Sequence, residues 1–342
     1  MALPSNDRIF FLRSIAGLVS VVLTTVIRCA AGAILHLLMV WMLLPEEFGV
    51  YVFALLCAHA FIALSHLGVK KFVVQTESEH AIADAFKVQC TLSWIVWVVA
   101  MLSANSVGAF IGSQQGTLLF RIFATQLIFL PITFGYQGIA ERDARHDLSQ
   151  RANRLGIYAE LSIGVIALRL GYGALGVAFA ITCRSLIEAA TLVITLGPRH
   201  LRLRHSRLDM EHAKTFLKFG LPMLASGFLV FGYWNVDDIF VGRILGEEQL
   251  GLYAFAFRFP HYLTLLSAAL VTVSLPVLAR LRNDDTQTER VFAVLTRVTA
   301  YGMGLCVILC LLYGEQLIQL IFGDAWLPAL VPFQIFVVVV SC

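Results

Sequence analysis

The sequence predicts an all-α integral membrane protein in which two helical bundles surround a central cavity. Of its 342 residues, 59% are hydrophobic and only 14% are charged, whereas soluble domains are nearer ~45–50% apolar and ~25% charged. The apolar residues form ten long runs, and one short string occurs twice, at residues 44–54 and 245–256. A repeat in a membrane chain indicates two bundles related by symmetry, with a site between them, as is typical of a transporter.

The ten apolar runs are each long enough to span a membrane. A helix needs about 20 apolar residues to cross about 30 Å of hydrocarbon, and continuous runs exclude membrane strands, which alternate over about ten residues. The first run lacks a signal-peptide pattern, so we expect it to be a retained span. The predicted spans are residues 13–44, 48–68, 86–110, 117–139, 152–170, 174–197, 216–245, 249–279, 290–313 and 326–342.

The basic residues predict which ends of the spans face the cytoplasm. Most of the 25 Lys and Arg residues lie in or beside every second connection. By the positive-inside rule, the amino terminus is then cytoplasmic and the repeated Glu-Glu turns face outward. The opposite, outward connections are predicted at Pro45–Glu47, Ser113–Gly116, Gly171–Gly173, Gly246–Glu248 and Gly314–Gln316.

The longest polar stretch divides the chain into two halves. We expect a first six-helix bundle at residues 1–197, a cytoplasmic linker at 198–215 and a second bundle of four helices at 216–342. Both halves then begin on the cytoplasmic side, so the repeats are parallel and related by an axis along the membrane normal. Because the last apolar run reaches residue 342 without a basic stop, we expect the second bundle to be truncated, with two further helices in its complete form.

Two blocks of residues resemble a known family. The first is Leu44–Val69, with its Pro-Glu-Glu-Phe-Gly-Val-Tyr turn, and the second runs from Phe219-Gly220-Leu221-Pro222 through Asn235-Val236-Asp237-Asp238 to Leu320–Trp326. In order and spacing they are similar to the polysaccharide transporter family, which includes the O-antigen flippases. That family belongs to the multidrug/oligosaccharidyl-lipid/polysaccharide exporter superfamily.

The resemblance implies a role in lipopolysaccharide or other surface polysaccharide biosynthesis. The expected substrate is an undecaprenyl-diphosphate-linked oligosaccharide, an O-antigen or capsular or exopolysaccharide unit, moved across the bacterial cytoplasmic (inner) membrane by alternating access. Expected partners are this lipid-linked oligosaccharide, membrane lipids and other polysaccharide-assembly proteins. The sequence contains no Gly-rich phosphate loop and no metal-ligand spacing, so we expect no cofactor, metal, ATPase subunit or nucleic acid.

Charged side chains inside apolar runs are the first candidates for a binding site, since each costs about 2.5–3.5 kcal/mol on insertion scales. Arg28 and Arg258 are candidate substrate anchors in the lumen, because the Arg guanidinium is well shaped for paired phosphate contacts. The alternative is a charge satisfied by a neighbouring helix or a snorkelling side chain. Arg184 and Glu188, spaced i, i+4, are expected to form a structural pair.

Acids and histidines in the spans are candidates for ion or proton coupling. Asp237 is slightly favoured over Asp238, because the family pattern places Asn-x-Asp there. The alternative is an interhelical pair with Arg243 or a capped kink near the outer mouth. His59 and His261 occupy matching repeat positions, and imidazole titrates near neutral pH; the alternative for each is a hydrogen-bonded core residue. Glu160 would either protonate or pair across helices.

Other functions compete with the glycolipid flippase. A cation-coupled multidrug exporter or a peptidoglycan-precursor flippase belongs to the same superfamily. From another class, a membrane glycan polymerase or acyltransferase would need a large outer loop or a reactive His–Asp set, and the predicted outer connections are only a few residues long. We therefore expect no enzyme. Trp41 and Trp326 are expected to be anchors in the interfacial aromatic belt.

Overall fold

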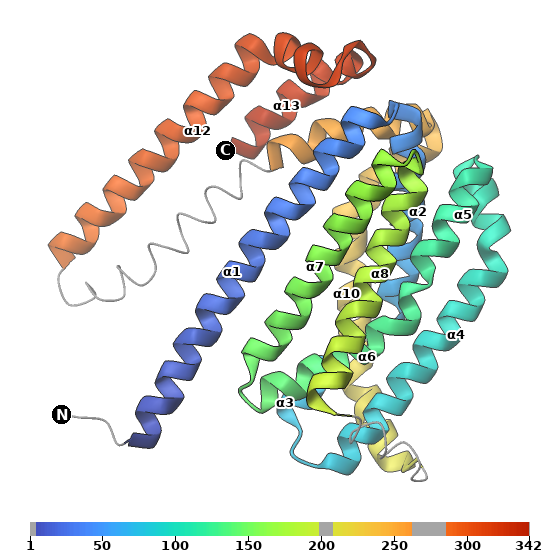
Figure 1. The fold of residues 1–342 in the computed structure, drawn as a ribbon, viewed down its shortest axis with the longest axis vertical. Helices are drawn as coiled ribbons and strands as arrows, with labels where there is room; N and C mark the ends of the chain where they lie inside the picture. Colours follow the sequence, from blue (N-terminus) through green and yellow to red (C-terminus); the bar gives the residue numbers. More distant parts are fainter. Residues whose placement is uncertain (1–4, 198–207, 262–284, 342) are drawn as a thin grey trace.

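The computed structural model consists of α-helices joined by short turns (Figure 1). It describes residues 5–197, 208–261 and 285–341, and within these ranges it contains no β-strand, which confirms the all-α prediction. Residues 247–261 are helical as well. The named elements are α1 (Ser5–Met42), α2 (Pro45–Ser65), α3 (Val69–Gln75), α4 (Glu79–Ile111), α5 (Gln114–Ala124), α6 (Gln126–Arg142), α7 (His146–Arg169), α8 (Gly173–Leu196), α10 (Met210–Leu245), α12 (Asp285–Phe322), the 3-10 helix η2 (Asp324–Ala329) and α13 (Leu330–Ser341).

Seven helical segments in the described ranges are long and apolar enough to cross a membrane, and they match seven of the ten predicted spans. The protein is therefore an α-helical membrane protein. Of the other three, span 152–170 forms as α7 but carries several charged side chains. Span 249–279 continues beyond residue 261 outside the described ranges, and span 326–342 is divided between η2 and α13.

One predicted outer connection is wrong. Gly314–Gln316 lies inside α12, which continues to Phe322. The helix ends instead at Gly323, whose φ of 87° is the left-handed conformation that glycine adopts without steric cost. A glycine inside an apolar helix need not end it, and only the backbone conformation separates the two cases. The other predicted outer connections lie at one end of the bundle, and the turns between α3 and α4 and between α6 and α7 lie at the opposite end (Figure 1).

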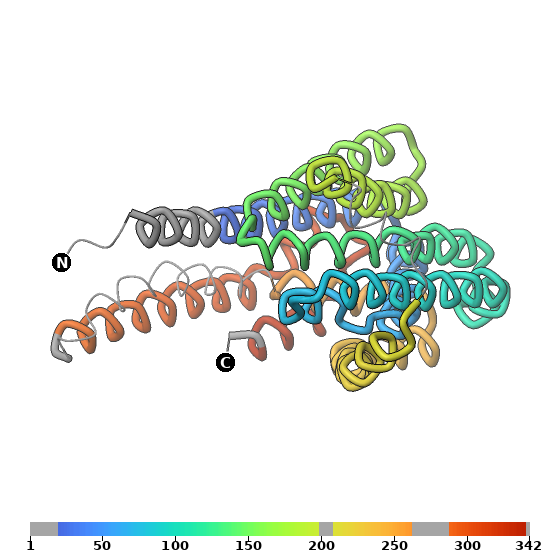
Figure 2. The backbone as a smooth tube through the Cα atoms, turned by 90° about the horizontal axis from the view of Figure 1, so that it is seen from below, coloured from blue at the N-terminus to red at the C-terminus, as the bar shows by residue number. Residues whose placement is uncertain are grey.

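The helices of the first half pack in layers, and α10 packs on their outer face. In Figure 2, α7 and α8 lie on one side, α4 in the middle and α10 on the other. The start of α10 is bound to the first half by aromatic contacts, since Phe216 lies 5.0 Å from Phe72 between ring centroids. Helix α12 lies beside α1, away from this group (Figures 1 and 2). Residues 198–207 of the predicted linker lie outside the described ranges.

The two repeated turns touch each other through their glycines. A Cβ atom built on Gly49 would lie 1.7 Å from the Glu247 carbonyl oxygen, and one on Gly251 would lie 1.9 Å from the Pro45 carbonyl oxygen. Pro45 and Glu247 are themselves equivalent in the repeat, four residues before each glycine. The contact is therefore reciprocal, as expected where two copies meet across a two-fold axis. Only glycine permits this backbone approach.

An aromatic cluster covers this turn contact. Trp326 of η2 is 1% exposed, and its ring lies 5.7 Å from that of Phe48 and 4.9 Å from that of Phe255. The prediction that Trp326 is a belt anchor is therefore wrong, because the 3-10 turn after Gly323 directs it inward. Trp41, by contrast, is 69% exposed. The cluster fills the space between the halves at the end where the repeated turns lie.

The predicted span 117–139 is interrupted at Thr125, between α5 and α6. The backbone N–H of Thr125 bonds the carbonyls of Arg121 and Ile122, both at 3.2 Å. A hydroxyl from α8 supports the interruption, since Thr182 donates to the Ile122 carbonyl at 3.0 Å. Pro131, which lacks an N–H, follows in the next turn of α6.

Replacing this hydroxyl tests its contribution. Thr182→Val keeps the shape but removes the donor, and we expect a loss of about 1 kcal/mol of stability, the usual net value of one hydrogen bond. Thermal unfolding in detergent measures it. The matched control is Thr195→Val, because the Thr195 hydroxyl bonds only carbonyls of its own helix. Equal effects of the two variants would contradict a role for Thr182 at the interruption.

Candidate functional site

A polar cavity of about 510 Å³ lies inside the first half. Helix α1 lines it with Val21, Thr24, Thr25 and Arg28, and α8 lines it with Ile181, Arg184, Ser185 and Glu188. Both sets have the i, i+3, i+4, i+7 spacing of one helix face. Together with α6, α7 and residues of α2 and α3, the walls comprise 17 residues, of which 13 are polar or charged. These helices are thus polar toward the bundle interior and apolar outside.

An ion network occupies one wall of the cavity. Arg184 donates to Glu188 at 2.8 Å and, across to α7, to Glu160 at 2.8 Å and to Asn153 at 3.2 Å. The i, i+4 pair of the sequence analysis is thus present, and Glu160 pairs across helices. Arg154, the sequence neighbour of Glu160, instead donates to Ser20 and Thr24 of α1. Two carboxylates around one guanidinium leave this network with one net negative charge.

Arg28 is the cation of the cavity that is not paired with another described residue. Its side chain is exposed, and in the part of the chain that the structure describes it has no ion-pair or hydrogen-bond partner. Its charge is close enough to that of Glu188 for the two to interact. Lys70, the other cavity cation outside the network, is paired with Glu141 at 2.7 Å. Arg28 is therefore the guanidinium available to an anionic ligand.

Arg258 lies outside this cavity as its described walls define it. The guanidinium is half-buried and sits 5.8 Å from the centroid of the Phe48 ring, a cation–π distance. Its charge interacts with His59 of the first half and with Asp238 of α10. The structure thus places the two predicted anchors at different positions: Arg28 in the cavity, and Arg258 at the contact between the halves.

The two predicted acids of α10 differ in their surroundings. Asp237 accepts a hydrogen bond of 2.7 Å from the Tyr253 hydroxyl, whereas Asp238 interacts with the charge of Arg258. Neither pairs with Arg243 among the described ion pairs, because the Arg243 guanidinium lies over the Phe110 ring at 5.4 Å. Tyr253 was part of the repeat, but its role as partner of Asp237 could not be predicted from the sequence.

The two matched histidines also differ. His59 is exposed on α2 and lines the polar cavity. His261 is exposed at the end of the helical segment 247–261, and its ring stacks with Phe257 at 6.0 Å. Their sequence equivalence therefore does not give them equivalent surroundings.

Sequence reasoning missed the amide side chains of the cavity. Gln126 and Gln137 lie on α6, and Gln150 lies on α7 beside Ser149. The candidates taken from the sequence were charged side chains and histidines, so these neutral amides were not among them. The sequence offered little signal for them, because Gln126 and Gln137 share their face of α6 with the apolar Leu130 and Phe134.

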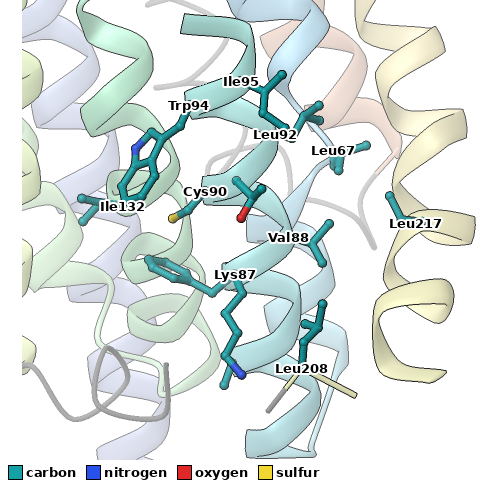
Figure 3. Close-up of a pocket in the computed structure, with 13 residues that line it drawn as sticks. Leu67, Lys87, Val88, Cys90, Leu92, Trp94, Ile95, Ile132, Leu208 and Leu217 are labelled. Carbon is teal, nitrogen blue, oxygen red and sulfur yellow. The ribbon is translucent and has the colours of Figure 1, made fainter. Parts of the chain in front are cut away.

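A second pocket, of about 550 Å³, differs in chemistry. Its walls are mostly apolar side chains of α4, and they are faced by Leu208, which precedes α10, and by Leu217 of α10 (Figure 3). Lys87 lies at one end, and its ammonium pairs with Asp84 at 2.7 Å. Ile95 in this pocket is 55% exposed on the apolar surface. Such a pocket suits lipid chains, and its few polar or reactive groups are Lys87, Cys90 and Thr91.

No group of three or more His, Cys, Asp or Glu side chains that could hold a metal occurs in the described ranges. The charged groups of the cavity are one guanidinium without a partner among the described residues and one ion network with a net negative charge, beside several neutral hydrogen-bonding groups. Fold and cavity together define a multi-pass helical membrane protein with a polar interior chamber.

The chain belongs to the family described as "Polysaccharide biosynthesis protein", whose model matches residues 38–331. A curated relative is the "Teichuronic acid biosynthesis protein TuaB" of Bacillus subtilis (strain 168), 22% identical over 249 residues. The match covers 70% of this chain and 51% of the relative, so the chain spans about half the length of that protein.

Solved transporters of the MOP superfamily share the fold. An inward-facing multidrug resistance MATE family transporter superposes with a TM-score of 0.58 at 17% identity, covering 93% of this chain and 76% of the other. A MOP superfamily transporter from Pyrococcus furiosus Vc1, described as having a binding pocket of reverse polarity, superposes with a TM-score of 0.54 at 16% identity. That match covers 95% of this chain and 77% of the other.

Proposed function

We propose that this chain acts as an exporter of the MOP superfamily for an undecaprenyl-diphosphate-linked oligosaccharide. The observation that carries the proposal is the polarity of the cavity, in which 13 of 17 wall residues are polar or charged. Sites for drug-like ligands are lined predominantly by apolar and aromatic side chains, with few polar groups. A hydrated glycan with a diphosphate needs a mostly polar lining, because its polar groups must find hydrogen-bonding partners when they leave water.

Arg28 supplies the anchor for the diphosphate in this mechanism. It is a cation without a protein partner in the described chain, and Arg binds phosphate oxygens in pairs. Lys70 lies in the first turn of α3 and Ser149 and Gln150 lie near the start of α7, so the cavity reaches the end of the bundle at which α1 and α7 begin (Figure 1). With that end cytoplasmic, the glycolipid enters from the inner leaflet while its polyprenyl tail stays in the bilayer.

The outer end is closed in this state. The reciprocal glycine contact and the buried Trp326 join the halves there. Alternating access then requires these contacts to separate, with Arg258 at the same contact positioned to receive the diphosphate. Asp237, Asp238, His59, His261 and Glu160 remain candidates for coupling to an ion or a proton. The sequence features that predict a bacterial inner membrane and a cytoplasmic amino terminus support this orientation.

The identity of the glycan is proposed at the level of a surface polysaccharide unit. The matched relative is named for teichuronic acid biosynthesis, and the family that the sequence resembles includes O-antigen flippases. Both names point to polysaccharide biosynthesis, so other polysaccharide-assembly proteins are the proposed partners.

A cation-coupled multidrug exporter is the second candidate. One solved transporter of the same fold is described as a multidrug resistance protein, and the acids Asp237 and Asp238 are available to a cation. A peptidoglycan-precursor flippase would share the diphosphate site and differ in its sugar. Transport itself is non-enzymatic, and we propose no covalent step at this site.

Translocation by reconstituted protein tests the proposal. A fluorescent undecaprenyl-diphosphate disaccharide is placed in vesicles containing the 342-residue chain, and dithionite quenching reports its movement between leaflets. We expect movement by the wild type. For Arg28→Ala we expect a loss of about tenfold or more, because a hydrogen bond to a charged group contributes about 1.5–3 kcal/mol and 1.4 kcal/mol is about tenfold.

The control is Arg169→Ala, because Arg169 is an exposed arginine outside the cavity walls. Normal translocation by Arg169→Ala together with a defect in Arg28→Ala supports the diphosphate anchor. Movement of a lipophilic cation such as ethidium, without movement of the glycolipid, would overturn the proposal in favour of the drug exporter. Movement of neither ligand by folded protein would also overturn it.

A further inference from the structure

The polar groups of the cavity fall into two sets. The first set is satisfied within the protein: Arg184 by Glu160, Glu188 and Asn153, and Lys70 by Glu141. These groups hold the walls together. They account for much of the charge of the cavity through pairing within the protein.

The second set has unused hydrogen-bonding capacity. The Gln126 amide accepts from the Ser185 hydroxyl at 3.2 Å through its oxygen, but its buried Nε2 has no partner in the structure. Gln126 is only 6% exposed. A buried donor without a partner costs about 1–3 kcal/mol, so the Gln126 amide gains stability when an acceptor reaches it.

Two further amide side chains line the same cavity. Gln137 and Gln150 line the cavity and make no hydrogen bond within the part of the chain that the structure describes. Gln126, Leu130, Phe134 and Gln137 have the spacing of one face of α6, and the rise from Gln126 to Gln137 is about 16 Å. Gln150 stands on α7. The open amides thus extend along the cavity instead of converging on one point.

We propose that Gln126, Gln137 and Gln150 form a subsite for the sugar rings of the ligand, separate from the diphosphate site at Arg28. A primary amide both donates and accepts hydrogen bonds, as neighbouring sugar hydroxyls do, whereas a phosphate only accepts. Phe134, between Gln126 and Gln137 on the same face, supplies the apolar surface that the C–H face of a sugar ring needs. This inference rests on the proposed function and names the side chains that bind the sugar rings of the ligand.

The subsite makes a specific prediction about binding. Two ligands are compared on the purified 342-residue chain: undecaprenyl diphosphate with a disaccharide and undecaprenyl diphosphate without sugar. Gln137→Met and Gln150→Met keep the side-chain length and remove the amide. We expect each to weaken binding of the disaccharide form about fivefold to tenfold, the effect of one lost hydrogen bond, and to leave binding of the bare diphosphate unchanged.

Two controls separate the subsite from the anchor and from folding. Arg28→Ala is expected to weaken both ligands alike. Gln114→Met changes an exposed glutamine in the first turn of α5, outside the cavity walls, and is expected to change neither. Thermal unfolding of each variant shows whether its fold is retained.

The outcomes distinguish this inference from the function on which it rests. If Gln137→Met and Gln150→Met weaken both ligands equally, or neither, the sugar subsite is overturned while the diphosphate anchor stands. If the folded wild type binds neither ligand, the proposed function fails and the subsite with it. Weakening confined to the disaccharide form supports both.

Discussion

Gly49→Ala is expected to destabilise the protein by about 3 kcal/mol, the upper range for an overpacked site. The added methyl carbon would lie 1.7 Å from the Glu247 carbonyl oxygen and 2.9 Å from the Gly251 nitrogen. Both are backbone atoms, which cannot rotate away as the end of a long side chain can. Helix α2 must therefore separate from the segment 247–261, and thermal unfolding in detergent measures the loss.

The reciprocal contact supplies a second variant and a control. Gly251→Ala is expected to match Gly49→Ala, and the double variant to be less than additive, because one separation relieves both clashes. Gly227→Ala on α10 adds a methyl group with no atom within 4 Å, so it should be neutral or slightly stabilising. Unchanged stability of Gly49→Ala would show that the turns do not meet as closely as the structure places them.

Arg184→Gln is expected to cost about 3–5 kcal/mol, the range for breaking a buried ion pair. The substitution leaves Glu160 and Glu188 facing each other inside a membrane protein without the guanidinium that both now contact at 2.8 Å. The unpaired carboxylates then repel each other and have lost their main donor. Thermal unfolding and the yield of folded protein both report this cost.

Neutralising the acids should reverse the effect. The triple variant Arg184→Gln, Glu160→Gln, Glu188→Gln removes all three charges and is expected to recover most of the stability, since neutral groups need no counter-charge. The control is Arg151→Gln, which breaks an exposed i, i+4 pair with Asp147 at 3.8 Å and should cost about 0.5 kcal/mol or less. If Arg184→Gln costs no more than Arg151→Gln, the network contributes nothing to folding.

Patterns local to the chain predicted the fold class well. Continuous apolar runs predicted ten spans, and seven of them match helices that are long and apolar enough to cross a membrane, because burial in lipid requires a continuous apolar helix whatever its neighbours. The i, i+4 spacing predicted the Arg184–Glu188 pair, because both residues lie on one helix face. The repeat at residues 44–54 and 245–256 predicted equivalent turns, although the reason for its glycines was not apparent.

Contacts between distant segments could not be predicted in this way. Trp326 was expected at the membrane interface and is buried, because the turn after Gly323 brings it against Phe48 and Phe255. Gly314 was expected in a connection and lies inside α12. In both cases the local composition fitted two environments equally, and packing against remote residues decided between them.

The candidate site likewise has features that the sequence predicted and features that depend on contacts between distant segments. Its charged residues were found from the sequence, since any charge inside an apolar run is conspicuous. Which of them pair with one another, which has no partner among the described residues and which lies at the contact between the halves depends on which helices are neighbours. The sequence by itself determined a multi-pass helical membrane protein of the polysaccharide biosynthesis family. Only the tertiary structure decided which polar side chains are left for a ligand, because a hydrogen-bonding group is satisfied or free according to partners far away in the chain.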